Sequence, residues 1–220
     1  MAFPPGSTVK PFSLLALLES GRLTANEEYV CSQHLSIAGR SFNCSHPPSP
    51  LPMDVSRTIA YSCNCAVAHF AERFRPGELS RGLQRSGLTG FMRDDLTGPA
   101  CILQALGEEG VQVTAMELLG AYRRLAGRIG EKAIAPVLAG LEGAVEFGTA
   151  QAARLEKIRV AGKTGSVRTS HIGHGAWFAG FAPSRSPEVA VTIFVAGQSG
   201  GADAAPIAGR LLRHYFAGRA

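Results

Sequence analysis

Apolar residues recur at helical spacing along most of the first 155 residues. Residues 7–20 carry a stripe of four leucines and predict the first helix. Further helices are predicted where the spacing returns between turn residues: 54–61, 65–74, 79–87, 98–107, 113–127 and 135–156, the last with a break near Gly148. Thr114 and Glu117 form a capping box at the start of one of them. Residues 22–52 lack the spacing and predict a long loop.

The pattern changes after residue 156, where runs of β-branched and aromatic residues replace the helical stripes. Three such runs, joined by Gly, Pro and Ser, predict strands: 157–167, 175–183 and 188–197. Residues 202–216 predict a terminal helix. The expected fold is α+β and forms one domain over 1–220. A mainly helical part, 7–155, packs beside an antiparallel sheet flanked by helices, 156–220.

The composition is that of a globular protein, since 45% of the 220 residues are apolar and can form a core. The formal net charge of +5 comes from scattered arginines, without a basic run or an interleaved aromatic stripe. This pattern argues against a nucleic-acid partner. The apolar run 189–197 is far too short to cross a membrane, and the first residues do not form a secretion signal.

The chain has five cysteines: Cys31, Cys44, Cys63, Cys65 and Cys101. An odd count in a chain of this size does not indicate a disulfide scaffold. Cys31, His34, Cys44 and His46 lie close together in sequence and suggest zinc, but a Cys-x-His pair reaches a tetrahedral ion poorly. The spacing therefore favours the absence of a metal. A Cys31–Cys44 disulfide outside the cytosol is preferred to zinc, and unpaired loop thiols are a further alternative.

The first candidate for chemistry is Ser7-x-x-Lys10, at the start of the first predicted helix. Residues i and i+3 share one face of a helix, and free backbone N–H groups at its start favour an oxyanion. A lysine with a lowered pKa can remove the serine proton and activate the hydroxyl as a nucleophile. The alternative is an N-cap serine beside a surface lysine. Lys10 is, however, one of only four lysines.

The second candidate is Ser62-x-Asn64, which interrupts two predicted helices. From a short turn the two side chains can point the same way. The serine can then relay a proton and the asparagine can hold a substrate amide. The alternative is a cap and turn between helices. The same spacing recurs at 41–43, but that segment lies in the predicted loop, a poor platform for accurate geometry, so Ser62 is preferred.

The third candidate is Lys163-Thr164-Gly165, on the first predicted strand. A lysine and a hydroxyl on an edge strand can bind a carboxylate. Glycine at 165 lets a substrate backbone approach and pair with the strand. Taken alone, a strand that ends in a glycine turn is the simpler interpretation.

In this order the three motifs resemble the signature motifs of penicillin-binding proteins and serine β-lactamases. The resemblance extends to a penicillin-binding transpeptidase domain over nearly the whole chain. It is carried by the stretches PPGSTVKPF, SCN, VTAMELLGAYRRLA, GTA and AGKTGS…GAWFAGFAP. The family fold is an all-helical subdomain beside a sheet flanked by helices, which agrees with the pattern of apolar residues.

The resemblance implies a role for each motif residue. Ser7 is acylated by the D-Ala-D-Ala end of a peptidoglycan stem peptide, or by a β-lactam antibiotic that mimics it, and Lys10 is its base. Ser62 relays the proton to the leaving group with help from Lys163. Asn64 holds the substrate amide.

On the sheet, the resemblance implies that Thr164 binds the terminal carboxylate beside Gly165. The backbone N–H groups of Ser7 and Ser166 form the oxyanion hole. No cofactor and no metal are required. The parent protein is expected to be membrane-anchored and to act outside the cytoplasm.

The chain departs from the family pattern ahead of the serine. Family members contribute one or two strands of the sheet from that region, but only six residues precede Ser7. We therefore expect a truncated or minimal domain whose sheet lacks its N-terminal strands and leaves the edge of 188–197 uncovered. Such a chain is expected to be less stable alone, or to self-associate through this edge.

Three other functions fit the motifs. A serine β-lactamase needs a second base for fast deacylation, and no motif supplies one, although Glu142 and Glu146 lie upstream of the sheet. Asn64 argues against the class that uses a carbamylated lysine. A D,D-carboxypeptidase fits equally well. A degenerate sensor or scaffold that binds the cell-wall peptide without turnover is the alternative of another class.

Overall fold

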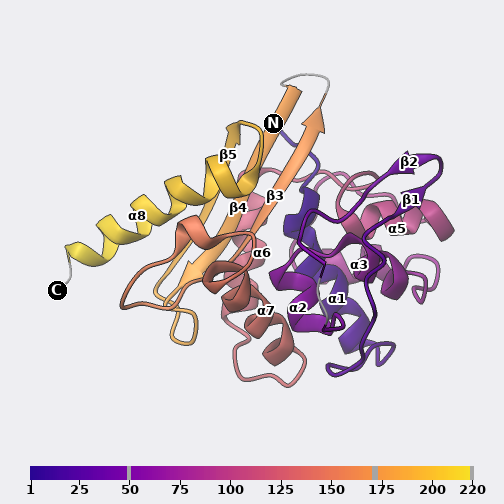
Figure 1. Cartoon of the computed structure of the whole chain (residues 1–220), viewed down its shortest axis with the longest axis horizontal. Coiled ribbons are helices and arrows are strands. Elements are labelled where there is room, and N and C mark those ends of the chain that lie inside the picture. Colours follow the sequence, from indigo (N-terminus) through magenta and orange to yellow (C-terminus); the bar gives the residue numbers. More distant parts are fainter. Residues whose placement is uncertain (49–50, 170–172, 219–220) are drawn as a thin grey trace.

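The computed structural model describes residues 1–48, 51–169 and 173–218. The predicted α+β fold class is confirmed, with helices beside a small sheet (Figure 1). The α-helices are α1 (Lys10–Glu19), α2 (Val55–Ala60), α3 (Asn64–Ala71), α4 (Glu78–Arg85), α5 (Gly98–Leu106), α6 (Ala115–Ala126), α7 (Ile134–Glu146) and α8 (Ala205–Ala217). Shorter turns are η1 (Gly6–Val9), η2 (Gln151–Ala153) and η3 (Gly200–Ala204).

The sheet consists of β3 (Ala161–Thr169), β4 (Gly173–Ala182) and β5 (Val189–Ala196), antiparallel in that order. Alternate side chains of β4 enter two cores. Trp177 and Phe181 pack with α6 and the helical part, whereas Ala176 and Phe178 pack with α8 on the other face. Because helices cover both faces, β4 reads as a continuous apolar run rather than an alternating one.

Helix α1 lies inside the helical part and is buried on all sides over Lys10–Leu17. The sequence predicted an apolar stripe along one side of this helix, whereas the side chains on every side of it are buried. A helix surrounded by other helices needs apolar residues all round. This burial places Lys10 of the first motif in the interior instead of on a solvated face.

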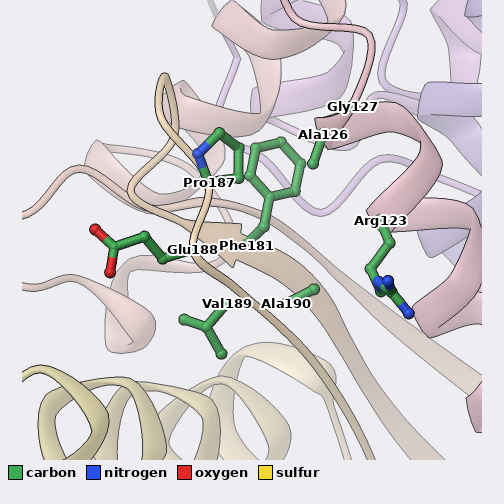
Figure 2. A pocket seen from close by; sticks show the side chains of 8 residues that line it. All are labelled: Arg123, Ala126, Gly127, Phe181, Pro187, Glu188, Val189 and Ala190. Atoms are coloured by element: carbon green, nitrogen blue, oxygen red, sulfur yellow. The ribbon is translucent and has the colours of Figure 1, made fainter.

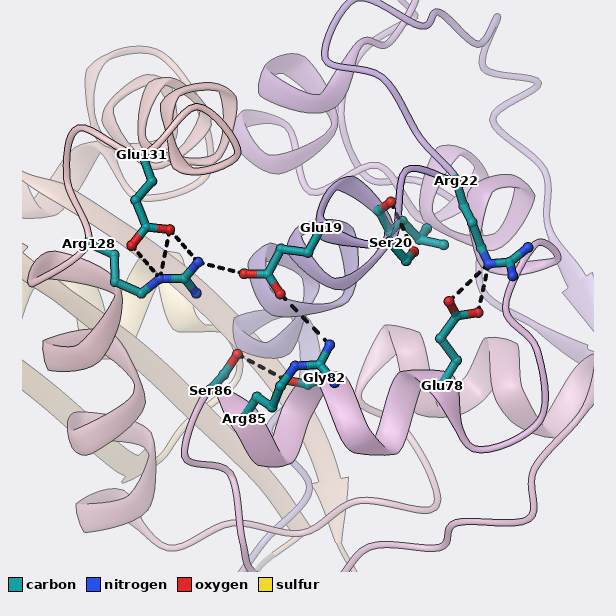
Figure 3. A network of polar contacts seen from close by, with 10 residues as sticks. Glu19, Ser20, Arg22, Glu78, Gly82, Arg85, Ser86, Arg128 and Glu131 are labelled. Carbon is teal, nitrogen blue, oxygen red and sulfur yellow. Dashed lines mark hydrogen bonds and ion pairs between the residues drawn. The ribbon is translucent and has the colours of Figure 1, made fainter.

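The far end of α1 is tied to its neighbours by ion pairs (Figure 3). Glu19 accepts a hydrogen bond from Arg128 at 2.6 Å and lies 3.9 Å from Arg85 on α4. Arg22 pairs with Glu78 at 2.9 Å. These groups are partly exposed, so each pair contributes about 0–1 kcal/mol. The position of α1 therefore depends mainly on burial.

Two predicted segments differ in detail. The helical run predicted over 135–156, with a break near Gly148, has its main helix end at Glu146, where the chain turns so that the Thr149 N–H bonds the Ala60 carbonyl at 3.3 Å. Within the rest of the predicted run, the short turn η2 is the remaining helical segment of the described residues. The predicted loop 22–52 contains a short hairpin of two strands with two residues each, β1 (Ser36–Ile37) and β2 (Arg40–Ser41).

Among the described helices, none has the length and apolar character that a transmembrane span requires.

Strand β5 has a second edge that pairs with no other strand of the described sheet. Its side chains are half-buried, with the Phe194 ring tilted against Phe3 and Trp177 on one face and Ile193 packed toward α8 on the other. The faces of β5 are therefore covered while its outer backbone edge lacks a strand partner. Self-association along this edge stays a prediction.

Candidate active site

The residues of the first motif lie at the junction of η1 and α1. Ser7 is in the 3-10 turn η1, and Lys10 is the first residue of α1. The helix predicted from residue 7 thus opens with a tighter turn. In a 3-10 turn the side chains at i and i+3 eclipse each other, so Ser7 and Lys10 project from the same side.

Turn η1 is held by buried side chains from distant elements. The Tyr122 hydroxyl of α6 donates to the Thr8 carbonyl at 3.0 Å, and the Trp177 indole of β4 donates to the Pro4 carbonyl at 3.0 Å. Both aromatic rings are fully buried, which fixes the two donors. The placement of Ser7 is therefore determined by α6 and β4.

Two glycines let η1 lie directly against β3. Gly6 has φ +53°, and a Cβ there would lie 2.7 Å from Val167 Cγ1. A Cβ on Gly165 would lie 2.8 Å from the Pro5 carbonyl oxygen. The sequence predicted Gly165 as room for a substrate backbone. The structure supplies a packing reason for glycine at this position.

We expect Gly6→Ala to lower the free energy of unfolding by about 2–4 kcal/mol, because it adds left-handed strain and a contact with β3. Gly21→Ala is the matched control, since Gly21 has φ +68° with no atom within 4 Å of a Cβ. It should lose about 1 kcal/mol from backbone strain alone. Thermal unfolding measures both, at about 2–4 °C per kcal/mol. Equal losses would contradict the tight packing of η1 on β3.

The second motif occupies the turn between α2 and α3. Ser62 has φ +57°, a strained conformation for a residue with a side chain. Cys63 caps α3, its Sγ accepting the Ala66 N–H, and Asn64 is the first residue of the helix. The tight turn lets the side chains of Ser62 and Asn64 converge, as predicted.

These side chains converge on Lys10. Its Nζ donates to the Ser62 carbonyl at 2.9 Å, to the Ser62 hydroxyl at 3.2 Å and to Asn64 Oδ1. Lys10 is fully buried, and burial lowers its pKa to about 8. An amine with this pKa is neutral in about a tenth of the molecules at pH 7. Lys10 can therefore accept a proton at physiological pH.

The third motif brings a second buried lysine to the same region. Lys163 on β3 is fully buried, and its Nζ donates to the Thr164 carbonyl at 3.1 Å. Burial, and then the charge of Lys10, lower the pKa of Lys163 well below its usual range. The effect of the Lys10 charge on Lys163 indicates that β3 and the start of α1 form one electrostatic site.

The three motifs meet at one cleft of about 500 Å³ between the helical part and β3. Six of the predicted residues line it: Ser7, Ser62, Asn64, Thr164, Gly165 and Ser166. Lys10 and Lys163 lie fully buried behind the lining residues. The Ser166 hydroxyl accepts the Gly200 N–H at 3.1 Å, which ties β3 to η3.

Several lining residues were not singled out from the sequence. Thr149 shares a hydrogen bond of 2.8 Å with the Thr164 hydroxyl. Glu108 follows α5 and lines the cleft, and burial raises the pKa of its carboxyl while the charge of Lys10 opposes the shift. Ser45 also lines the cleft. These residues lie in loops, where hydrophobic periodicity carries no signal. Only Thr149 belonged to a stretch of the family resemblance.

The two carboxylates upstream of the sheet lie elsewhere. Glu142 accepts hydrogen bonds from the Ser184 hydroxyl at 2.6 Å and from Arg185 at 3.1 Å. Glu146 pairs with Arg154 at 3.3 Å. Neither lines the cleft, so both act in packing and ion pairing.

A second hollow, of about 320 Å³, lies between the end of α6 and the β4–β5 turn (Figure 2). Phe181, Pro187 and Val189 form much of its wall, and Arg123 flanks it. It contains no residue of the three motifs. Active sites combine a concave surface with convergent polar groups and perturbed pKa values, which are features of the first cleft.

Comparison with known proteins identifies the family of the chain. The sequence profile of the penicillin binding protein transpeptidase domain matches residues 1–213. The chain belongs to this family. Among curated proteins, stage V sporulation protein D of Bacillus subtilis (strain 168) is 24% identical over 268 residues. The match covers 96% of this chain and 42% of that protein, so the chain spans less than half of this relative.

Solved structures of penicillin-binding proteins share the fold. The D,D-transpeptidase domain of a peptidoglycan glycosyltransferase from Eggerthella lenta matches with a TM-score of 0.83 and 20% identity, over 100% of this chain and 66% of that one. Penicillin-binding protein A of M. tuberculosis, as an imipenem acyl-enzyme, matches with a TM-score of 0.80 and 20% identity, over 98% and 60%. The transpeptidase fold is thus present despite low identity.

Proposed function

We propose that this penicillin-binding transpeptidase domain cross-links peptidoglycan stem peptides through an acyl-enzyme on Ser7. The observation that carries the proposal is the buried Lys10, whose amine has a pKa of about 8 and contacts Ser62 and Asn64 at the cleft that Ser7 lines. A base, a nucleophile and a proton relay at one cleft are the groups that acyl transfer needs.

In the proposed acylation, neutral Lys10 takes the proton of the Ser7 hydroxyl as its oxygen attacks the D-Ala-D-Ala carbonyl. The backbone N–H groups of Ser7 and Ser166 stabilise the oxyanion. The peptide bond breaks, and the departing D-alanine amine receives this proton from Lys10 through the Ser62 hydroxyl, assisted by the amine of Lys163. An acceptor amine from a second stem peptide then attacks the ester, gives its proton back through the same groups to the Ser7 oxygen, and releases Ser7.

Substrate orientation in this proposal comes from groups that line the cleft. The Asn64 amide holds the substrate amide, and Thr164 binds the terminal carboxylate beside Gly165 on β3. A carboxylate bound there would in turn raise the lowered pKa of buried Lys163. The same groups accept a β-lactam, the ligand class named for the M. tuberculosis relative. Cell-wall substrates place the proposed activity outside the cytoplasm, in a membrane-anchored parent protein.

The proposal is tested with a fluorescent penicillin. The expected result is one covalent adduct per chain by intact mass, mapped to the peptide that contains Ser7. A folded sample that forms no adduct would contradict the proposal and favour a degenerate sensor or scaffold. Rapid release of hydrolysed penicillin would instead indicate a β-lactamase.

A hydrolase, such as a D,D-carboxypeptidase, is the second candidate, and Glu108 is the observation that favours it. This half-buried carboxylate lines the cleft, and burial raises its pKa, which suits a base that activates water. For the proposed transpeptidase, we expect Glu108→Gln to leave the lifetime of the penicilloyl adduct within about twofold. Intact mass against time measures it, with Glu109→Gln as the exposed neighbouring control. A lifetime at least about tenfold longer in Glu108→Gln alone would favour the hydrolase.

A further inference from the structure

A cluster of thiols and one imidazole lies beside the turn that carries Ser62 and Asn64. Within the described residues, the ligand atoms of Cys31, Cys44, His46 and Cys63 all lie within 4.8 Å of one another. The first two cysteines are half-buried, and His46 and Cys63 are buried. The cluster draws on sequence positions up to 32 residues apart. Only the fold brings them together.

The spacing of these atoms is that of a tetrahedral ligand set. The Sγ atoms of Cys31 and Cys44 are 3.6 Å apart, those of Cys31 and Cys63 3.4 Å, and those of Cys44 and Cys63 3.7 Å. His46 Nε2 lies 3.7 Å from the Cys31 Sγ. Zn–S bonds of about 2.3 Å at tetrahedral angles place sulfurs about 3.8 Å apart. One ion fits between all four ligands after shifts of a few tenths of an ångström.

The hydrogen bonds around His46 prepare its ring for a metal. Nδ1 lies 2.8 Å from the Pro47 carbonyl oxygen, which can only accept a hydrogen bond. This contact is shorter than the 3.4 Å between Nδ1 and Gln33 Nε2, so we assign the proton to Nδ1, and Nε2 presents its lone pair toward the Cys31 sulfur. Histidines that bind metals are oriented by this kind of second contact.

Backbone N–H groups reach two of the sulfurs and can support metal-bound thiolates. The Gln33 N–H donates to the Cys31 Sγ, and the Ala66 N–H donates to the Cys63 Sγ, both at 3.4 Å. Cys63 also caps α3, where the helix dipole favours a negative charge. Three thiolates and one imidazole form a soft ligand set that suits Zn²⁺ in tetrahedral geometry.

The disulfide preferred from the sequence accounts for fewer of these contacts. All five cysteines are free in the structure, and a disulfide requires sulfurs about 2.05 Å apart. Joining Cys31 to Cys44 would leave Cys63 and His46 buried beside the bond without a common partner. The sequence argument against zinc considered His34, but His34 is exposed and is not among the four clustered residues.

We propose that Cys31, Cys44, His46 and Cys63 bind one structural Zn²⁺, which fastens the loop 31–46 to the turn that carries Ser62 and Asn64. Cys63 lies between these two residues, and both bond Lys10. The same loop accepts a hydrogen bond from Asn64 Nδ2 at the Phe42 carbonyl, at 2.9 Å. The ion thus positions the Ser-x-Asn motif without entering the cleft. This inference does not depend on the proposed reaction.

The test is the zinc content of the full chain, purified without an affinity tag and measured by plasma mass spectrometry. We expect about one zinc per chain, and near zero for Cys31→Ser, Cys44→Ser and Cys63→Ser. Cys65→Ser is the matched control, because its sulfur lies 3.5 Å from the Cys44 Sγ but outside the four-ligand set. His46→Asn should lose the zinc as well, and His34→Asn is its matched control. Zinc loss in both controls, or zinc retained in all four ligand variants, would overturn the ligand assignment.

Wild-type protein provides a second measurement that does not depend on the folding of variants. Replacement of zinc by Co²⁺ should give thiolate-to-cobalt charge-transfer bands and the visible bands of a tetrahedral site. Chelation should lower the Tm by about 10 °C, with recovery on adding Zn²⁺ but not Mg²⁺. A metal-free chain with a disulfide, or with free thiols and an unchanged Tm in chelator, would overturn the proposal. Stoichiometric binding of a different metal would overturn the zinc assignment.

The proposed positioning of Ser62 and Asn64 by the zinc ion is tested by a separate measurement. After chelation, the rate of β-lactam acylation should fall at least tenfold at a temperature where circular dichroism shows folded protein, and added Zn²⁺ should restore it. An unchanged rate would remove the positioning role. If wild-type protein binds zinc but never forms an adduct, the metal site stands and the proposed transpeptidase function fails.

Discussion

Ser7→Ala should abolish covalent labelling by a fluorescent penicillin, with a loss of at least about 10³-fold in acylation rate. The variant removes the only atom proposed to form the ester, while Lys10, Ser62 and the cleft remain. Ser7 is half-exposed, and its hydroxyl makes no hydrogen bond among the described contacts. The free energy of unfolding should therefore change by less than about 0.5 kcal/mol. Gel fluorescence and intact mass measure labelling, and thermal unfolding measures stability.

Ser45→Ala is the matched control for this variant, because Ser45 lines the same cleft and has no proposed role. It should label at the wild-type rate. Persistent labelling of Ser7→Ala, or equal loss in Ser45→Ala, would refute Ser7 as the nucleophile. A loss of label accompanied by unfolding would not count as support, which is why the melting curve is recorded on the same sample.

The acylation rate should rise about tenfold per pH unit below pH 8 and level off above it. The physical reason is that only neutral Lys10 can take the proton from Ser7, and burial lowers the pKa of Lys10 to about 8. Lys10→Gln removes the base and should lower the rate at pH 8 by about 10³-fold, with the tenfold slope lost. Stopped-flow acylation from pH 6 to 9, corrected for uncatalysed β-lactam hydrolysis, measures both effects.

Lys132→Gln is the control, since Lys132 is exposed and lies outside the cleft. Its pH profile should match that of the wild type. A flat wild-type profile, or a slope that survives in Lys10→Gln, would assign the base to another group. The buried Lys163 is then the next amine to test, because its pKa is also lowered by burial.

Much of the fold follows from local patterns. The capping box predicted at Thr114 and Glu117 begins α6, and Asp54 accepts the Arg57 N–H at the start of α2. These signals act within one helical turn, so the sequence reports them directly. The three strands also lie within a few residues of their predicted positions, because β-branched and aromatic runs between turn residues leave few alternatives.

The sequence also predicted most of the residues that the structure brings together at the cleft. The motifs identified six residues that line one cleft, together with two lysines buried behind it. The sequence did not identify Glu108, which enters the cleft from a loop after α5. It also discounted a metal, because it compared Cys31 and Cys44 with their nearest histidines. Cys63 joins them only through the packing of the loop on α3.

The sequence by itself determined which elements form and which residue types carry the chemistry, because caps, apolar spacing and short motifs are interactions between residues a few positions apart. The tertiary structure decided the rest. It buried Lys10 and Lys163, lowered their pKa values and placed Ser62 and Asn64 against Lys10 from more than fifty residues away. Burial and electrostatic coupling depend on what surrounds a group in space, which local sequence does not encode.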